Sequence, residues 1–600
     1  MRKSGTWNWY ILAISIVILQ AASSLEGQAA HQDAQSQTTF AFLHVNVIPM
    51  NSPGILRDQT VIVRGEKILT LGPSNRAQVP ADARRIEAAG QYLIPGLTDA
   101  HVHLQTPTEF PLHLANGVTT VFNLDGRPAH LLWRKRIADG KTLGPTIFTT
   151  GPIFGSAHSP EEAVRMVDEQ AALGYDAVKI YNQVSKAEYP ALIAEAKRKH
   201  MLLMGHVARG PDFEMTLESG QSIAHLEEYT YTFFNPKRDD INSHIVYDET
   251  KIPDAVKLTV QAGIFVTPTL FTYASIVEQA TALNEFLKNP ALHYDAPWTQ
   301  SDLQPAVNRY KNRFDASYYP TLRASLALQR KLVKALADAG VPLLCGTDAS
   351  DVGPVAGFGI HDELQEMVND GLTPFQALQT ATVNPARYFR KADQIGAIEA
   401  GKLADLVLLN KNPLNDIKNT RAVAGVMVRG RWLDSKELAR LLSDVPANYE
   451  RQINETRQLL ETKPEQAIRV LEESDPLDDL ADAAMSQLFA SRGFDKLHAV
   501  ILAIRQSNPK SHLASEEYVN NFGYSLLNER KFAAAVATLQ INTQDFPKSA
   551  NAWDSLADVQ SQSDDVPHAI ENYKKALEID SNYGNAAGAR KFIAEHEKKP

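Results

Sequence analysis

The stretch YLIPGLTDAHVHLQ, residues 92–105, decides how the rest of the sequence is interpreted. It starts as an apolar run and ends in two histidines, His101 and His103, with one residue between them. Residues i and i+2 of a strand point to the same face, so both imidazoles project together. Two neutral imidazoles placed in this way can converge on one metal ion. An isolated pair is equally well explained as two partly exposed histidines at a strand end.

The composition describes a large globular chain. Its 600 residues exceed what one hydrophobic core normally supports, which predicts several domains. A formal net charge of −10, with no interleaving of basic and aromatic residues, argues against a nucleic-acid partner. The single cysteine, Cys345, excludes an intrachain disulfide, and its apolar surroundings predict a buried thiol.

The N-terminus is typical of an export signal. A basic start precedes an apolar run from Trp9 to Leu19 and then small residues, the pattern of a secretory signal peptide over residues 1–30. We therefore expect an exported protein, periplasmic or secreted. The run is short for a membrane span, so no membrane is expected in the mature form. An uncleaved N-terminal anchor is the alternative.

Two strand-like segments flank a long middle region. β-Branched and polar residues alternate along residues 38–92, and a similar strand-like pattern is found at residues 396–440. We expect these segments to form one small composite β-sandwich domain. The region between them, residues 93–395, would then be an inserted domain.

The inserted region alternates short apolar strands with helical stretches, which favours a parallel (β/α)8 TIM barrel. Candidate strands end in LIPGLTDAH, GVTTVFNL, PTIFTTG, DAVKIY, MLLMGH, SIAHL, GIFVTPTL and VPLLCGTD. Between Pro268 and Val341 a long helical insertion with an aromatic, polar middle is expected to cover the C-terminal face as a lid.

Residues 450–600 are polar and helix-rich, with no strand-like runs, and predict an all-α region of helical repeats. Four pairs share a 34-residue spacing: Val519 and Trp553, Gly523 and Ala557, Ala535 and Ala569, Leu539 and Tyr573. This period resembles tetratricopeptide repeats, although Ser581 stands where the first repeat has Pro547. A protein partner is a possible ligand of such repeats, and we expect hydrolysis to survive their removal.

Residues with metal-ligand chemistry also occupy other predicted strand ends. Lys179, His206, His225 and Asp348 each lie at the end of a different strand. Barrel enzymes build their sites from the C-terminal ends of several strands, so these residues and the two histidines are expected to meet.

This set resembles the binuclear metal-dependent hydrolases of the amidohydrolase superfamily, especially imidazolonepropionase-like and prolidase-like members. The resemblance covers residues 38 to about 440, including NPAR (384–387) and GAIEAGKLADLVLLN. It implies two divalent ions. Carried onto this chain, it implies one ion held by His101, His103 and Asp348, a second held by His206 and His225, and a CO2-derived carbamate on Lys179 bridging both. Zinc is the expected metal, although iron, manganese and cobalt suit the same ligands.

The resemblance also implies a reaction. Two ions share a water whose lowered pKa supplies hydroxide, and Asp348 acts as general base and then acid. The expected substrate is a small molecule with an amide or cyclic amide bond, such as a dipeptide. A mononuclear deaminase, which would not need Lys179, and a lactone hydrolase are alternatives. A barrel without activity, with the repeats acting as a binding module, is a further alternative.

Three other residues are weaker candidates. His158, in a glycine-rich loop, matches a family position that touches substrate, although a solvated histidine explains it nearly as well. Tyr229 could hydrogen-bond the substrate or stack at the barrel rim. His361 begins a predicted helix, where a structural role or support of a ligand is expected.

Overall fold

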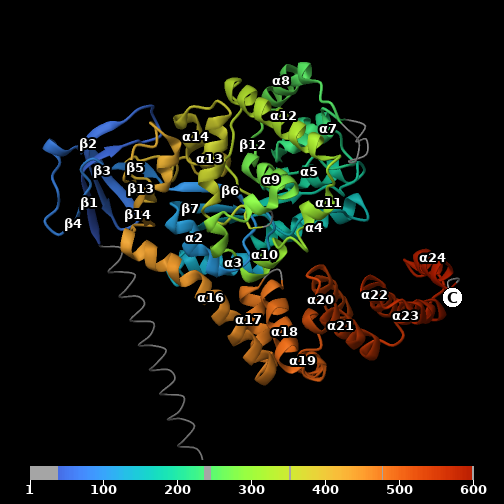
Figure 1. Ribbon diagram of the computed structural model, residues 1–600. Coiled ribbons are helices and arrows are strands. Elements are labelled where there is room, and N and C mark those ends of the chain that lie inside the picture. Colours follow the sequence, from blue (N-terminus) through green and yellow to red (C-terminus); the bar gives the residue numbers. More distant parts are fainter. Residues whose placement is uncertain (1–37, 236–244, 351–352, 476–477, 598–600) are drawn as a thin grey trace, which may run out of the picture.

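The computed structural model describes residues 38–235, 245–350, 353–475 and 478–597. It contains a β domain, a central α/β domain and a C-terminal all-helical region (Figure 1). The predicted signal peptide at residues 1–30 lies outside the described residues. Among those residues, no helix is both long and apolar enough to cross a membrane.

The β domain combines strands from both flanking segments in one eight-stranded sheet. Its path runs β15-β14-β13-β5-β1-β2-β3, and β4 pairs with β1. The two segments join where β5 and β13 pair antiparallel, with Pro95 opposite Leu406. The strands are β1 (Thr39–Val47), β2 (Leu56–Arg64), β3 (Lys67–Pro73), β4 (Arg84–Glu87), β5 (Tyr92–Pro95), β13 (Leu406–Leu409), β14 (Val423–Val428) and β15 (Arg431–Asp434).

The central domain contains two groups of parallel strands. One has the order β6-β7-β8 and the other β12-β11-β10-β9. These strands are β6 (Leu97–Val102), β7 (Val118–Asn123), β8 (Thr146–Thr149), β9 (Ala177–Ile180), β10 (Leu202–Gly205), β11 (Ser222–Ala224) and β12 (Val266–Thr267). They are mostly buried along their whole length, as expected of parallel strands covered on both faces.

Parallel bridges connect these groups in the order of a barrel. Thr150 bridges Ala177, which joins the end of β8 to β9. The predicted eighth strand, residues 341–348, is not a continuous strand. Leu343 bridges Val266 of β12, and Ala349, the next residue after the segment, bridges Val102 of β6. The Leu344 N–H also donates to the Val266 carbonyl, and the Ala100 N–H donates to the Cys345 carbonyl. Seven strands and this eighth segment therefore follow one another side by side, in the order that the (β/α)8 prediction requires.

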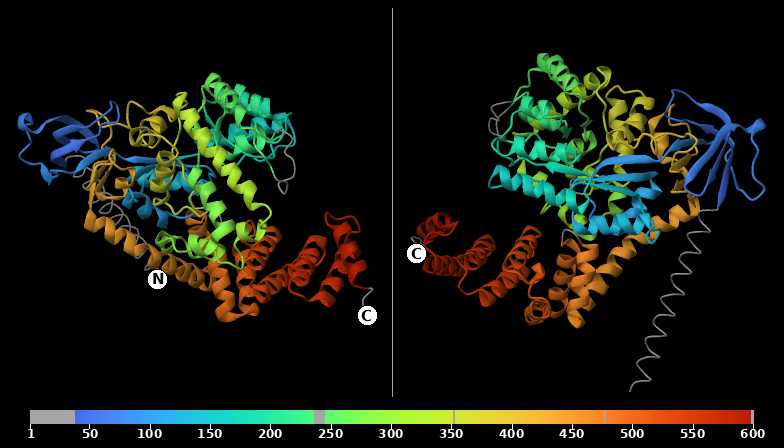
Figure 2. Two further views of the ribbon diagram at one scale, coloured as in Figure 1. Left: turned by 45° about the horizontal axis from the view of Figure 1, so that its top comes forward. Right: turned by 180° about the vertical axis from the view of Figure 1, so that it is seen from behind.

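Helices follow most of the strands, and their ends follow ordinary capping rules. The Ser159 hydroxyl accepts from the Glu162 N–H at the start of α4, and Gly174 ends that helix with φ 88°. The helices of this domain are α2 (Phe110–Ala115), α3 (Pro128–Ala138), α4 (Pro160–Leu173), α5 (Tyr189–Arg198), α6 (Phe213–Glu218), α7 (Glu227–Thr232), α8 (Ile252–Ala262), α12 (Tyr319–Asp338), α13 (Gly359–Asn369), α14 (Pro374–Thr380) and α15 (Val383–Tyr388). They cover the outside of the strands (Figure 2).

The predicted insertion between Pro268 and Val341 is helical, and α12 forms its C-terminal part. It contains α9 (Leu270–Phe286), the 3-10 helix η4 (Pro290–Tyr294), α10 (Pro297–Asp302) and α11 (Arg309–Arg313). Tyr273, Tyr310, Phe314 and Tyr318 pack into an apolar cluster that ties α9, α11 and the start of α12 together. We refer to residues 270–318 as the lid.

The C-terminal region begins with a long helix, α16 (Ser435–Thr462), which runs from the β domain along the barrel (Figures 1 and 2). Then follow α17 (Pro464–Ser474), α18 (Asp479–Arg492), α19 (Phe494–Ser507), α20 (Glu516–Asn528), α21 (Phe532–Asp545), α22 (Ala550–Gln562), α23 (Val566–Ile579) and α24 (Ala586–His596). Helices α20 and α21 return 34 residues later as α22 and α23. The helical hairpins thus follow the predicted period; their identity as tetratricopeptide repeats stays a prediction.

Candidate metal centre and substrate cavity

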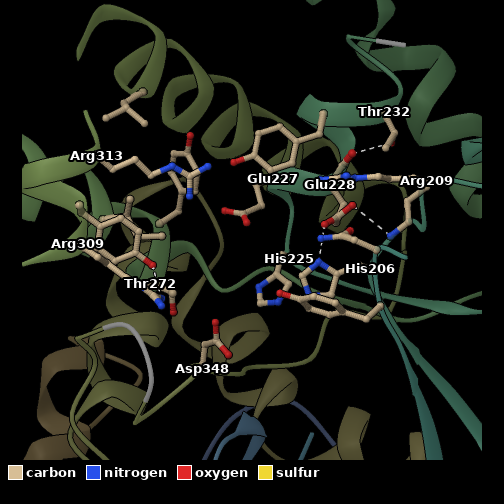
Figure 3. A pocket seen from close by; sticks show the side chains of 18 of the residues that line it. His206, Arg209, His225, Glu227, Glu228, Thr232, Thr272, Arg309, Arg313 and Asp348 are labelled. Atoms are coloured by element: carbon tan, nitrogen blue, oxygen red, sulfur yellow. Dashed lines mark hydrogen bonds and ion pairs between the residues drawn. The ribbon is translucent and has the colours of Figure 1, made fainter. Parts of the chain in front are cut away.

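The predicted ligand residues lie at the C-terminal ends of the barrel strands. His101 is on β6 and His103 directly follows it, while Lys179 is on β9. His206 and His225 follow β10 and β11, and Asp348 lies in the eighth segment. Figure 3 shows His206, His225 and Asp348 pointing into one hollow.

Three of these residues form a compact group of donors. Asp348 Oδ1 lies 2.9 Å from His101 Nε2 and 3.0 Å from His103 Nε2. Their ligand atoms all lie within 4.8 Å of one another, the one such group of three or more potential ligands found among the described residues. A single carboxylate oxygen facing two imidazole nitrogens is an arrangement that a divalent cation can occupy.

The protonation states of this group suit a metal. Burial lowers the pKa of His101 to about 3, so its ring is neutral at pH 7. Burial opposes ionisation of Asp348, but His101 and His103 hold its pKa well below the usual range. Neutral imidazole and ionised carboxylate are the forms that bind metal ions.

The second pair of histidines lies beside the first group. The His225 ring centroid is 4.7 Å from that of His101 and 4.8 Å from that of His206. His206 Nδ1 lies 2.6 Å from Glu228 Oε1, and the N–H of Val207 donates to Glu228 Oε2 at 3.1 Å. The carboxylate therefore fixes Nδ1 as the donor, which leaves Nε2 of His206 with its lone pair available for a ligand.

Lys179 is buried, with 1% of its surface exposed, in the middle of the histidines. Its Nζ lies 3.5 Å from His101 Nε2. Among the described residues, no carboxylate lies within ion-pair distance of it, so a pairing across the barrel does not explain its burial. Burial lowers the pKa of Lys179 to about 8, against the attraction of Asp348 and Glu228.

The backbone holds two ligands in a strained conformation. His225 has φ 74° and Asp348 has φ 55°, values that non-glycine residues rarely adopt and that occur most often at functional sites. Asp99 fixes the segment before Asp348, because its carboxylate accepts from the N–H of Thr347 at 3.0 Å and from its hydroxyl at 2.6 Å. The site is therefore shaped by the backbone as well as by side chains.

A cavity of about 720 Å³ opens above these ligands. His103, Lys179, His206, His225 and Asp348 form its floor, and the lid provides much of its wall. Three arginines, Arg209, Arg309 and Arg313, also line it, and the last two belong to α11 of the lid. Aromatic side chains fill the wall between them: Tyr231, Tyr247, Tyr273, Tyr310, Phe314 and Tyr318.

Glu227 is an acidic residue of the cavity wall near Arg313. It lies half-buried in the cavity wall, between Arg313 and the ligands (Figure 3). Burial raises the pKa of Glu227 to about 8, and Arg313 lowers it only in part. At pH 7 this carboxyl is therefore largely protonated, and it offsets little of the positive charge of Arg313.

The weaker candidates from the sequence lie elsewhere. His158 is exposed before α4, and its N–H donates to Glu162 at 2.7 Å; it is not among the residues that line the cavity. Tyr229 is fully buried, with its hydroxyl 3.0 Å from the Thr259 hydroxyl, so it packs in the core behind the cavity. His361 is buried, with Nδ1 2.9 Å from the Thr420 hydroxyl, which supports a structural role.

Two residues of the site were missed in the sequence. Glu228 orients His206, and Gln105 lines the cavity two positions after His103. A signal for Glu228 was present, because a carboxylate three residues after a ligand histidine at a strand end can reach a neighbouring ligand. Gln105 had no such signal, since its partners lie in distant parts of the chain.

Histidines, a carboxylate and a buried lysine at the strand ends of a parallel barrel define the class of metal-binding (β/α)8 barrel proteins. Residues 92–433 match the model of the amidohydrolase family, and the chain belongs to that family. Members of the family are metal-dependent, which agrees with the donor group described above.

Individual relatives are distant. An adenine deaminase from Moorella thermoacetica is 23% identical over 398 residues, which span 64% of this chain and 56% of the relative. An imidazolonepropionase from Micrococcus luteus is 23% identical over 59% of this chain and 88% of its own length. A solved Xaa-Pro dipeptidase with bound methionine superposes with a TM-score of 0.52 at 20% identity, over 66% of this chain and 100% of that structure. The chain thus spans little more than half of the first relative.

Proposed function

We propose that this protein hydrolyses a C–N amide bond with two divalent ions bound at the strand ends. His101, His103 and Asp348 would hold one ion, and His206 and His225 the other. The donor set supports this assignment, because its imidazoles and carboxylate are near one another and the buried members are in metal-binding protonation states. This grouping is the observation that carries the proposal.

Lys179 completes the proposed site as a carbamate formed with CO2. An ammonium buried among metal ligands would repel the ions, whereas a carbamate offers one oxygen to each. Its burial, its 3.5 Å approach to His101 and the lack of a carboxylate partner within the described chain support this role. Zinc is the metal we expect.

When bound, the ions supply Lewis acidity, which activates water and polarises the carbonyl of the substrate. The protein's own part lies with Asp348, whose ionised carboxylate accepts the proton of the attacking water and delivers it to the leaving nitrogen. Glu228 keeps His206 oriented throughout. The aromatic wall excludes bulk water from the reacting groups.

The cavity indicates which amides fit. Arg309 and Arg313 bring two fixed positive charges to the wall opposite the ligands, and guanidinium groups bind carboxylates in a bidentate way. Arg313 also lies 5.3 Å from the Phe314 ring centroid, which holds it against the wall. We therefore infer a substrate with a free carboxylate on the amine side of the scissile bond: a dipeptide or an N-acyl amino acid.

The test combines metal analysis with a substrate panel. We expect two ions per chain, hydrolysis of N-acyl amino acids and dipeptides, and loss of activity on the corresponding amino-acid amides. Arg313→Met should raise KM for the carboxylates by at least tenfold, about 1.4 kcal/mol, while Arg323→Met, on an exposed arginine of α12, should not. The proposal is contradicted if the enzyme hydrolyses no substrate of the panel, or if the purified chain holds no metal ion.

A deaminase remains the second candidate, because the first relative is named for that activity. It would release ammonia from an aminated ring, hold one ion and tolerate Lys179→Met. Our proposal requires that Lys179→Met lose at least one ion, and that a metal-stripped wild-type enzyme regain activity only when bicarbonate accompanies the metal.

We also propose that residues 1–30 export the protein and that the C-terminal helices bind a protein partner. The basic, apolar and small-residue order of the N-terminus supports the first. The repeated hairpins support the second. Cell fractionation with sequencing of the mature N-terminus tests export; an unprocessed chain in the cytoplasm would contradict it.

A further inference from the structure

The loop after β6 is joined to the lid by the side chain of Gln105. The indole N–H of Trp298, on α10, donates to Gln105 Oε1 at 2.8 Å, and the Thr299 hydroxyl donates to the same oxygen at 3.4 Å. On its other side, Gln105 Nε2 donates to the carbonyl of Ser350 at 3.5 Å. One side chain thus connects the loop after His103, the loop after Asp348 and the lid.

Trp298 also faces the C-terminal region. Its ring packs edge-on against Tyr449 of α16, with centroids 5.6 Å apart, and it contacts the apolar core of the C-terminal helices. Tyr449 and Val445 in turn belong to a buried cluster that contains Ala349, the residue after Asp348. Side chains of α16 thus share one apolar cluster with the Asp348 loop, and they connect to the His103 loop through Trp298.

A second bond links α16 to the same part of the barrel. The Thr108 hydroxyl donates to Gln452 Oε1 at 2.9 Å. The next helices are attached separately, because the indole N–H of Trp133 donates to the carbonyl of Glu473 at 2.7 Å. These contacts attach the C-terminal region to the barrel near the metal-bearing loops. That hydrolysis survives removal of residues 450–600 stays a prediction, because Val445 and Tyr449 precede that range.

We propose that Gln105 and Trp298 are positioning residues through which the C-terminal helices hold the His103 and Asp348 loops in metal-binding geometry. Buried apolar contacts from α16 set the place of Trp298, and its N–H sets the orientation of Gln105. The link would carry any displacement of α16, including one caused by a partner on the repeats, to the first metal ion.

The test uses the full chain and a double-mutant cycle. Trp298→Phe keeps a ring against Tyr449 but removes the N–H donor, and Gln105→Met keeps the length of the side chain but removes its bonds. Trp432→Phe is the matched control, because Trp432 packs edge-on against Phe42 in the β domain at 5.2 Å. The readouts are the rate of metal loss to a chelator, kcat and KM, and the melting temperature.

We expect each variant to lose metal about 5 times faster than wild type, which corresponds to the free energy of one neutral hydrogen bond. The loss of activity should appear mainly as a lower kcat. The double variant should be no worse than Gln105→Met alone, since that change already removes the bond to Trp298. Wild-type metal retention in either single variant, effects that multiply in the double variant, or an equal effect of Trp432→Phe would overturn the proposal. The proposal rests on the proposed metal site: a wild-type chain that binds no ion would refute that site, whereas bound ions with unchanged retention refute only this link.

Discussion

Glu228 offers the sharpest test of the second histidine pair. Replacing it with glutamine keeps the size of the side chain but leaves one acceptor oxygen where two N–H groups now donate, those of His206 and Val207. One donor must then face the amide NH2, and losing a hydrogen bond to a charged group costs about 1.5–3 kcal/mol. Residues that orient metal ligands typically contribute 10- to 100-fold in affinity, which is about the same free energy. We therefore expect Glu228→Gln to lower the affinity for one of the two ions by about 10- to 100-fold.

The measurement is a titration with a metal chelator, which counts the ions lost and their order. Glu188→Gln is the matched control, because Glu188 is also buried and its two oxygens also accept backbone N–H groups, from Ala157 and Ser185, but it lies outside the ligand set. The reasoning is refuted if Glu228→Gln holds both ions as tightly as wild type, or if the control loses metal equally.

Three further predictions test other parts of the molecule. Asp348→Asn should lower kcat at least about 100-fold in a chain that still melts cooperatively, because the proton acceptor is lost; steady-state kinetics within tenfold of wild type would contradict this. Burial raises the pKa of Asp482 to about 7, so between pH 4 and 7 the folded chain binds more protons than the unfolded one and stability falls as pH rises. Asp482→Asn should therefore melt above wild type at pH 8 but not at pH 4, as scanning calorimetry can check, and a constant difference would exclude this origin. Gly523→Val should destabilise the C-terminal helices by about 1–3 kcal/mol in denaturant unfolding, because a Cβ at Gly523 comes within 2.6 Å of Leu539; a wild-type midpoint would refute this packing.

The strands of the barrel could be predicted because each is a short, apolar run that ends in a polar residue. Parallel strands are buried on both faces, so their sequences are uniform and easy to find. The eighth segment was found in the same way from VPLLCGTD, but its pairing consists of bridges at Leu343 and Ala349 and scattered backbone hydrogen bonds, without a continuous ladder. Sequence patterns report burial, and they do not report how much of a ladder is formed.

The candidate site was predictable to the extent that its chemistry is local. His101, Lys179 and Asp348 could be assigned because each marks the end of its own strand. Tyr229 was a candidate for substrate contact or for stacking at the rim, but its side chain is buried and its hydroxyl lies 3.0 Å from that of Thr259. The arginines of the lid could not be assigned from the sequence, since only the folded insertion brings them over the ligands.

The pairing of β5 with β13 has a consequence for how the chain is made. These strands flank the whole barrel, so hundreds of residues must leave the ribosome after β5 before its partner exists. Until then the edge of β5 is open, and an open, apolar strand edge invites pairing with other chains. The last part of the sheet is thus completed late in synthesis, and a chaperone that shields residues 92–95 would act at the moment when this protein is most prone to aggregate.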